Sequence, residues 1–254
     1  MTGVRTEYGV GAITSGEDYV LHYGTNERFD GKTRLIVAAH GHNNTAAQLV
    51  QNSAYCGKPL AAAVASGRYM VLGIADAGLA TFGNQAAVDA IGAAVTYGVS
   101  RGAKSGKYGL FGYSMGGASA LNRVKQDYAN VAGALLYAPL TDLDWAYSTT
   151  GHTPKANNAT YTSEINTAYG SYAATAGYRI WDEPASFGNG VPVLICHATD
   201  DNTVPYSLST SFISFVSKSY VKMRSPDITG DHTGLFANVP NGDVVAFYDS
   251  LTWS

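Results

Sequence analysis

The sequence contains few charged residues, and their signs nearly balance. Asp, Glu, Lys and Arg make up 14% of the 254 residues, and the formal net charge is −3. Nucleic-acid binding requires a basic surface, so the composition predicts no nucleic-acid partner. No apolar run approaches the roughly 18–20 residues of a membrane-spanning helix. The sequence therefore predicts no membrane span.

Cysteine is almost absent. Cys56 and Cys196 are the only two cysteines, which is too few for a disulfide framework. Cys196 lies in the apolar run VPVLICH, and we expect it to be a small buried hydrophobe that is not paired with Cys56. The first twenty residues contain no apolar segment typical of a secretory signal. The Tyr-, Gly- and Asn-rich composition is compatible with an extracellular or virion-associated protein as well as with a cytoplasmic one.

Apolar residues are plentiful, at 46% of the chain. Short, continuous apolar runs are typical of strands buried on both faces of a parallel sheet. They alternate with longer helical patterns, and this order predicts an α/β fold: a mostly parallel sheet with helices on both faces, in a single domain of residues 1–254. The expected strands are 18–24, 33–41, 68–76, 107–114, 131–140 and 191–200, and the expected helices are 45–55, 84–102, 116–129, 207–218 and 241–254.

The segment 84–102 carries the strongest helical pattern. Ala87, Ile91, Val95 and Val99 recur every four residues, which predicts that they form the buried face of an amphipathic helix. Gly102 follows at the position where a glycine commonly ends a helix.

The segment from about 141 to 189 interrupts the strand–helix alternation. It is rich in Tyr, Trp, Asn, Thr and Ala, and a structureless loop of this length is improbable in a compact domain. We expect an inserted cap over one end of the sheet, with a helix within 162–177. Most of its aromatic side chains are expected to form a small core of their own, and Trp145, Tyr147 and Trp181 are candidates for lining a substrate groove.

The stretch GYSMG, residues 112–116, fits the pattern G-x-S-x-G between an expected strand and an expected helix. This pattern requires a sharp turn that exposes the serine oxygen, with small residues two positions before and after it. Gly112 and Gly116 meet that requirement. The context predicts that Ser114 is a nucleophile, and a serine needs a general base to act as one.

With these pieces the chain resembles the α/β-hydrolase family. Four motifs carry the resemblance: HGH at 40–42, GYSMGG at 112–117, HATDDNTVP at 197–205 and GDHTG at 230–234. In that family the acid and then the histidine follow the nucleophile. The resemblance implies Asp201 as the acid, with Asp200 as the rival, and His232 as the base, the only histidine after both aspartates.

The same resemblance implies an oxyanion hole. Its first backbone donor would be the N–H of Met115, directly after the nucleophile, and its second the N–H of His42 or, as an alternative, Asn43. His40 is expected to have a structural role. His40 and His42 could instead begin the metal site of a metallohydrolase, but the following residues NNTAAQL supply no further ligand, so no metal is predicted.

These residues together predict a serine hydrolase that cleaves carboxylic esters, on a small-molecule or polymer-linked substrate, without a cofactor. An acyltransferase or a serine peptidase would use the same triad. A catalytically inactive binding module would keep the scaffold without turnover. The sequence favours the esterase because it contains no second domain or acidic specificity pocket that would select peptides.

Overall fold

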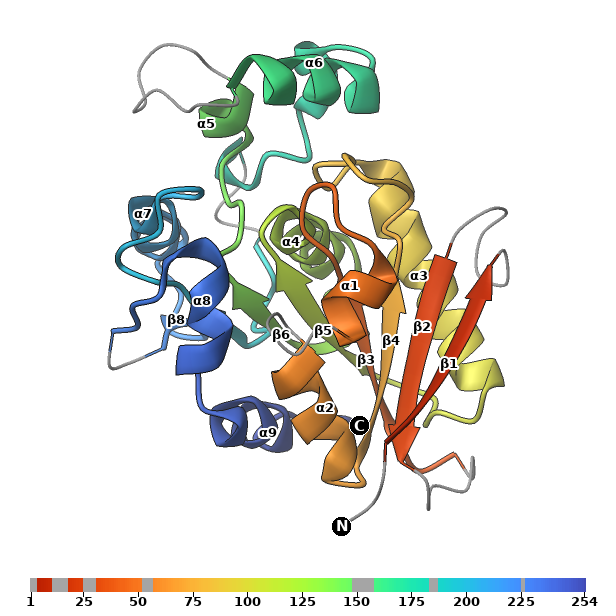
Figure 1. The fold of residues 1–254 in the computed structure, drawn as a ribbon. Helices are drawn as coiled ribbons and strands as arrows, with labels where there is room; N and C mark the ends of the chain where they lie inside the picture. The colour runs from red at the N-terminus through yellow and green to blue at the C-terminus, as the bar shows by residue number, and fades with distance from the viewer. Residues whose placement is uncertain are drawn as a thin grey trace.

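The apolar runs of the sequence form the strands of one sheet. A computed structural model of the chain describes residues 4–10, 18–24, 31–51, 57–147, 158–182, 187–224 and 227–254. The sheet has eight strands in the order β1-β2-β4-β3-β5-β6-β7-β8 (Figure 1). From β4 to β8 all neighbours are parallel, whereas β1 and β2 are antiparallel to their neighbours. The strands are β1 (Val4–Val10), β2 (Asp18–Gly24), β3 (Arg34–Ala39), β4 (Tyr69–Ile74), β5 (Tyr108–Tyr113), β6 (Val131–Tyr137), β7 (Val193–Cys196) and β8 (Val221–Met223).

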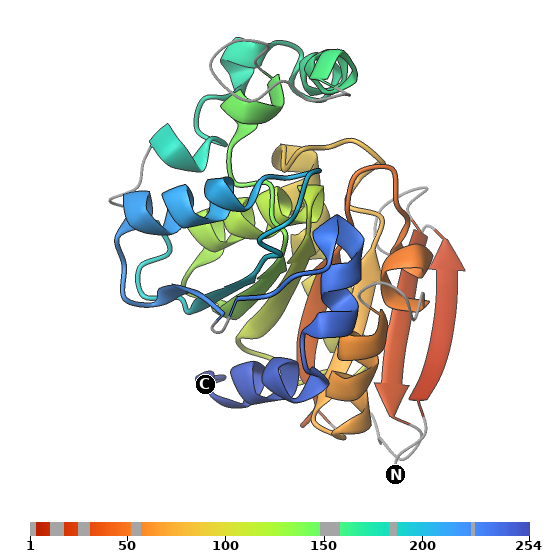
Figure 2. The same ribbon diagram turned by 60° about the vertical axis from the view of Figure 1, so that its left-hand side comes forward.

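Helices cover both faces of this sheet, as the alternating pattern predicts (Figures 1 and 2). One apolar cluster joins one face of the sheet to α1 (Ala46–Gln51), α2 (Gly57–Ala65), α8 (Asp231–Asn238) and α9 (Asn241–Asp249). A second cluster joins the opposite face to α3 (Gln85–Ser100), α4 (Met115–Asp127) and α7 (Tyr206–Val216). The α/β fold class predicted from the sequence is therefore confirmed.

The sequence patterns missed four of these elements. β1 and the three-residue β8 lie at the two edges of the sheet, where strands are not buried on both faces and lack a continuous apolar run. Helices α2 and α8 have only nine and eight residues. Their apolar residues therefore repeat too few times to show a helical period in the sequence.

The buried face of α3 differs from the predicted one. Ala87 and Ile91 are buried, but Val95 is only partly buried and Val99 is 37% exposed. Successive steps of four residues rotate by about 40° beyond a full turn in a helix of 3.6 residues per turn. The buried stripe therefore shifts to Ala94 and Gly98. Gly102 follows the helix with a φ of 92°, as expected for a terminating glycine.

The described helices between β6 and β7 lie beyond the carboxyl ends of the parallel strands (Figures 1 and 2). We call residues 141–192 the β6–β7 insertion. Its described helices are α5 (Leu143–Tyr147), α6 (Asn158–Tyr169) and the short 3-10 helices Tyr172–Thr175 and Ile180–Asp182. The helix expected within 162–177 thus begins earlier and breaks after Tyr169.

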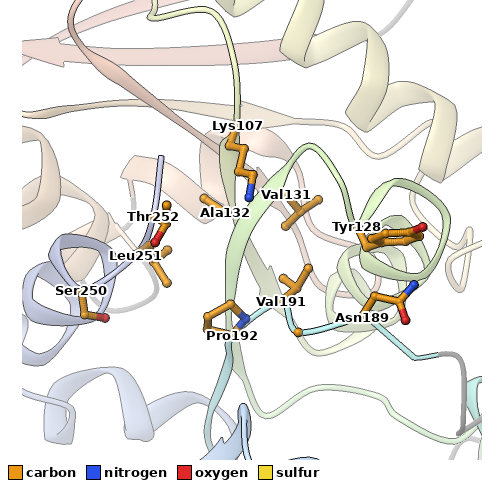
Figure 3. Close-up of a pocket in the computed structure, with 11 residues that line it drawn as sticks. Lys107, Tyr128, Val131, Ala132, Asn189, Val191, Pro192, Ser250, Leu251 and Thr252 are labelled. Carbon is orange, nitrogen blue, oxygen red and sulfur yellow. The ribbon is translucent and has the colours of Figure 1, made fainter. Parts of the chain in front are cut away.

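A cavity of about 340 Å³ lies at the opposite end of the sheet (Figure 3). Lys107, Val131 and Pro192 line it, next to the amino ends of β5, β6 and β7. It is therefore remote from Ser114, which follows the carboxyl end of β5.

Two further sequence predictions concern the rest of the chain. None of the helices in the described ranges is long and apolar enough to cross a membrane. Cys196 is a free, buried cysteine whose pKa burial raises to about 12. Cys56, its hypothetical partner, lies outside the described residues.

Candidate active site

Ser114 occupies a sharp turn between β5 and α4. Its backbone has φ 52° and ψ −117°, a left-handed conformation that a non-glycine residue adopts only under constraint. Three hydrogen bonds supply that constraint. The Ser114 N–H donates to the carbonyl of Tyr137 over 3.0 Å, and the Ser114 carbonyl accepts from the N–H groups of Gly117 and Leu140 over 2.9 and 2.8 Å. The neighbouring strand β6 and its following loop therefore hold the turn in place.

The glycines around Ser114 are required by close backbone packing. A Cβ added to Gly112 would lie 2.6 Å from the carbonyl oxygen of Gly116. A Cβ added to Gly116 would lie 2.5 Å from the carbonyl oxygen of His40. Both contacts are with backbone atoms, so no side-chain movement can relieve them. Glycine is thus needed at both positions of the G-x-S-x-G pattern.

The structure brings Ser114, His232 and Asp201 together from three separate segments. His232 Nε2 lies 3.0 Å from Ser114 Oγ, and His232 Nδ1 lies 2.7 Å from Asp201 Oδ2. Ser114 follows β5, Asp201 lies in the loop between β7 and α7, and His232 lies in the first turn of α8. All three segments follow the carboxyl ends of parallel strands, which is why the topology collects them at one edge of the sheet.

The Asp201 carboxylate is fully hydrogen-bonded. Its Oδ1 accepts the backbone N–H groups of Thr203 and Val204 over 2.7 and 2.9 Å. Its Oδ2 contacts two imidazole nitrogens, His232 Nδ1 and, over 3.1 Å, His197 Nε2. Burial by itself raises the pKa of Asp201, but the hydrogen bonds from His197 and His232, the attraction of His232 and the Val204 N–H outweigh it. The pKa of Asp201 is therefore held well below its usual range.

Asp200, the rival acid, and Asp231, the residue before His232, have other partners. Asp200 Oδ1 accepts the backbone N–H groups of Gly230 and Asp231 over 2.9 and 3.0 Å. Asp231 Oδ1 accepts the N–H groups of Thr233 and Gly234, and so satisfies the first turn of α8. Asp200 therefore fixes the loop that precedes His232, and it is Asp201 that contacts the imidazole.

His197 is a site residue to which the sequence interpretation assigned no role. Its side chain is fully buried. Its Nε2 faces two acceptors, Asp201 Oδ2 and the Val204 carbonyl at 2.8 Å, so this nitrogen carries the proton. Its Nδ1 lies 2.7 Å from Ser209 Oγ, which can donate to it. Its place four residues before Asp201, at the end of β7, is the signal that could have identified it.

The HGH segment forms a tight turn beside the strand-to-helix turn at Ser114, which we call the elbow. The Asn44 N–H donates to the Gly41 carbonyl over 3.1 Å, which places His42 and Asn43 at the two central positions. The Asn43 N–H donates to the Leu79 carbonyl over 2.9 Å. The His42 N–H has no acceptor among the described residues. Of the two second donors considered from the sequence, His42 is therefore the one whose amide does not already donate to a described residue.

The side chains of the two HGH histidines point to different partners. His40 is fully buried, with Nδ1 2.7 Å from the Gly41 carbonyl oxygen and Nε2 2.8 Å from the Ala75 carbonyl oxygen. His42 Nε2 lies 2.7 Å from Glu164 Oε2 of α6. Within the described ranges, no group of three or more His, Cys, Asp or Glu is placed to hold a metal ion.

Comparison with known proteins identifies the fold through structural similarity, whereas sequence similarity to them is low. No family model and no curated protein matches the sequence. Among solved structures, esterase B of Lactobacillus rhamnosis superposes with a TM-score of 0.74 at 14% identity, over 97% of this chain and 87% of that one. Est1E of Butyrivibrio proteoclasticus gives 0.68 at 18% identity, over 96% and 97%. The chain has the α/β-hydrolase fold.

Peptidases share this fold with the chain as well. A puromycin-hydrolyzing peptidase of Mycobacterium tuberculosis superposes with a TM-score of 0.67 at 15% identity. The match covers 98% of this chain but 38% of the peptidase. This α/β-hydrolase chain is thus similar to one part of that longer protein.

In this α/β-hydrolase fold the insertion packs on the elbow through an apolar cluster. Met115, Phe82, Leu143, Trp145 and Ile165 are all buried within it. Tyr147 packs on this cluster and stacks on Tyr172, with ring centroids 3.9 Å apart. Trp145 is 4% exposed and therefore presents little surface to a ligand.

Trp181, the third aromatic candidate for substrate binding, lies elsewhere. Its Nε1 donates to the Thr141 carbonyl over 2.8 Å, and its ring packs on Phe215 with centroids 4.5 Å apart. None of these three aromatic residues lines the cavity of about 230 Å³ between α6 and the loop before α3. Gly78, Thr81 and Glu164 are among the residues that line it.

Proposed function

We propose that this protein is a serine hydrolase that cleaves carboxylic esters through an acyl-enzyme on Ser114. The observation that carries the proposal is the unbroken path from Ser114 Oγ through His232 to the buried Asp201 carboxylate, with contacts of 3.0 and 2.7 Å. The path begins at a serine held in a strained turn. Strained backbone of this kind clusters at functional sites.

Acylation begins when His232 Nε2 accepts the proton of Ser114 Oγ while Oγ attacks the acyl carbon. Asp201 accepts a hydrogen bond from His232 Nδ1, which keeps Nε2 free to act as the base and stabilises the imidazolium that forms. The tetrahedral intermediate then expels the alcohol, which leaves with the proton held by His232. Deacylation repeats these steps with water as the nucleophile and releases the carboxylic acid.

Negative charge develops on the former carbonyl oxygen during both steps. We propose that the N–H groups of Met115 and His42 stabilise it. Met115 begins α4, where backbone N–H groups have no acceptor within the helix. A preorganised donor of this kind contributes about 10²–10³ to the rate.

We propose further that residues 1–254 act as a single domain in which the β6–β7 insertion is a cap. Its position beyond the carboxyl ends of the strands, on the side of the sheet that carries Ser114, supports this role. The substrate would be a small-molecule or polymer-linked ester. Trp145, Tyr147 and Trp181 would mainly support the cap, since each packs against protein groups.

A serine peptidase is the alternative that the same triad allows. The peptidase is similar to this chain over 38% of its own length, whereas the two esterases are similar over 97% and 87% of theirs. We therefore favour the ester over the amide as the natural substrate.

The proposal is tested by the hydrolysis of p-nitrophenyl acetate and of a matched p-nitroanilide. Wild type should turn over the ester at a rate well above that of the anilide. Ser114→Ala should lower kcat by more than about 10³-fold, because it removes the nucleophile. Ser207→Ala, an exposed serine at the start of α7, serves as the control and should keep wild-type turnover.

Three results would contradict the proposal. Absence of turnover in wild type would favour a binding module on a hydrolase scaffold. Unchanged turnover in Ser114→Ala would place the chemistry at another residue. Preference for the anilide over the ester would support the peptidase instead.

A further inference from the structure

We propose that Glu164, on helix α6 of the insertion, is a positioning residue for the oxyanion hole. By holding the imidazole of His42, it fixes the peptide unit whose N–H is proposed to face the oxyanion. The inference rests on the proposed function and adds a second role for the insertion, which then completes the catalytic site as well as covering it.

The contact between Glu164 and His42 is short and shielded. His42 Nε2 donates to Glu164 Oε2 over 2.7 Å, and the two side chains are 17% and 26% exposed. The imidazole also packs edge-on against Tyr161, with centroids 5.0 Å apart, and lies 5.7 Å from Phe82. A side chain held by one hydrogen bond and two aromatic rings has little rotational freedom.

This side chain belongs to a residue at the centre of a tight turn. Asn43, the next residue, has φ 56° and donates its N–H to the Leu79 carbonyl. The turn is therefore held at Asn43 by the loop before α3 and at His42 by α6. Between those two restraints lies the His42 amide, which is not donated to any described residue.

Helix α6 is itself fixed with respect to the elbow. Asn84 Nδ2 donates to the Ala168 carbonyl, and Tyr169 Oη donates to the Phe82 carbonyl, both over 2.9 Å. Ile165, next to Glu164, is fully buried in the apolar cluster that contains Met115. Helix α6 thus contacts His42 through Glu164 and shares an apolar cluster with Met115 through Ile165.

A purely structural role would make a different prediction. If Glu164 only docks α6 on the domain, its loss would lower the thermal stability and raise KM as the cap loosens. If Glu164 positions the oxyanion donor, its loss lowers kcat, because the donor acts mainly in the transition state. Comparing the change in kcat with the changes in KM and thermal stability therefore separates the two roles.

The experiment compares Glu164→Ala, Glu164→Gln and Ser163→Ala with wild type on p-nitrophenyl acetate. We expect Glu164→Ala to lower kcat about 10- to 100-fold with KM changed less than about threefold, since small misplacements of catalytic groups have effects of this size. Glu164→Gln keeps an acceptor oxygen and should recover most of the loss. Ser163→Ala alters the adjacent exposed residue of α6 and should match wild type.

A second variant removes the other partner of the same hydrogen bond. His42→Ala removes the ring but keeps the backbone N–H, and it should lower kcat to a similar extent. The double variant should lose no more than either single variant, because both remove one interaction. Thermal melts of each variant are recorded alongside, so that a loss of folding is distinguished from a loss of kcat.

Unchanged kcat in Glu164→Ala, with turnover in wild type, would overturn this role alone. A loss that Glu164→Gln does not recover, or that follows the fall in melting temperature, would also overturn it. Absence of turnover in wild type would instead overturn the proposed function, and this role with it.

Discussion

At the scale of single residues, the Asp201 carboxylate has a donor for each of its acceptor directions. Two backbone N–H groups contact Oδ1, and His197 and His232 contact Oδ2. A buried charge that is satisfied in this way stays ionised and does not rotate. The His197 contact and the lowered pKa of Asp201 each lead to a prediction.

His197→Ala should lower kcat/KM about tenfold. It removes one charge-assisted hydrogen bond from Asp201 and leaves a space at a fully buried position, so the carboxylate gains freedom and holds His232 less firmly. His197→Gln, which keeps an N–H donor, should retain more of the activity. The measurement is steady-state ester hydrolysis with each variant, and equal kcat/KM in His197→Ala and wild type would show that His197 has no positioning effect.

The pKa of Asp201 gives a prediction about stability. Because the folded-state pKa lies below the unfolded value of about 3.9, the ionised form favours the folded state, and this contribution is complete above that value. Below about pH 4 the unfolded chain takes up a proton that the folded protein does not. The difference in unfolding free energy between wild type and Asp201→Asn should therefore shrink by about 1.4 kcal/mol per pH unit.

Urea unfolding of both proteins between pH 7 and pH 2.5 measures this difference. The difference should decline as the pH falls below about 4. A difference that does not change with pH would mean that Asp201 has an ordinary pKa in the folded protein.

At the scale of structural elements, the elbow depends on the absence of side chains at Gly112 and Gly116. Their hypothetical Cβ atoms meet backbone oxygens of α4 and of the segment after β3. The turn that presents Ser114 therefore exists only as long as β3, β5 and α4 approach this closely.

Gly116→Ala should abolish ester hydrolysis and lower the melting temperature by several degrees, because the backbone of the elbow must move. Gly242→Ala is the matched control, since nothing lies within 4 Å of its added Cβ in helix α9. It should match or slightly exceed wild-type stability, because alanine is favoured over glycine within a helix. Wild-type activity in Gly116→Ala would contradict the close packing described for the elbow.

The elements differ in how well the sequence predicts them. The parallel strands β3 to β7 were predicted to within a few residues, because strands buried on both faces are continuous apolar runs. Edge strands β1 and β8 lack that signal. The start of α8 has no apolar pattern either, because the turn that begins it is set by Asp231, whose side chain accepts the N–H groups of Thr233 and Gly234. A pattern of apolar residues does not report such a cap.

At the scale of the whole molecule, the insertion shares one apolar cluster with Met115 of α4, Phe82 of the loop before α3 and Leu208 of α7. Side-chain hydrogen bonds from Asn84 and Tyr169 add further links between α6 and the loop before α3. We therefore expect the insertion and the sheet to unfold together.

The Trp253→Phe variant makes this measurable, because its two remaining tryptophans, Trp145 and Trp181, both lie in the insertion. Urea unfolding followed by tryptophan fluorescence and by far-ultraviolet circular dichroism should give coincident transitions. A fluorescence transition at lower urea would show that the insertion unfolds independently of the sheet.

The sequence predicts the residues of the candidate triad better than the residues that hold them in position. Ser114 and His232 could be named from a motif and from chain order, because few alternatives existed. Asp201 and Asp200 are adjacent, and only the tertiary structure shows which carboxylate reaches the imidazole. The roles of His197 and Glu164 depend on contacts across the fold, over 2.7 Å in the case of His42 and Glu164, and no local pattern encodes them.

The central claim is that Ser114 is a nucleophile activated by His232. Reaction with a fluorophosphonate, followed by peptide mass spectrometry, tests it most directly. The account predicts a single adduct on Ser114 in wild type and a labelling rate lower by more than about 10³-fold in His232→Ala. An adduct on another residue, or undiminished labelling of Ser114 in His232→Ala, would contradict it.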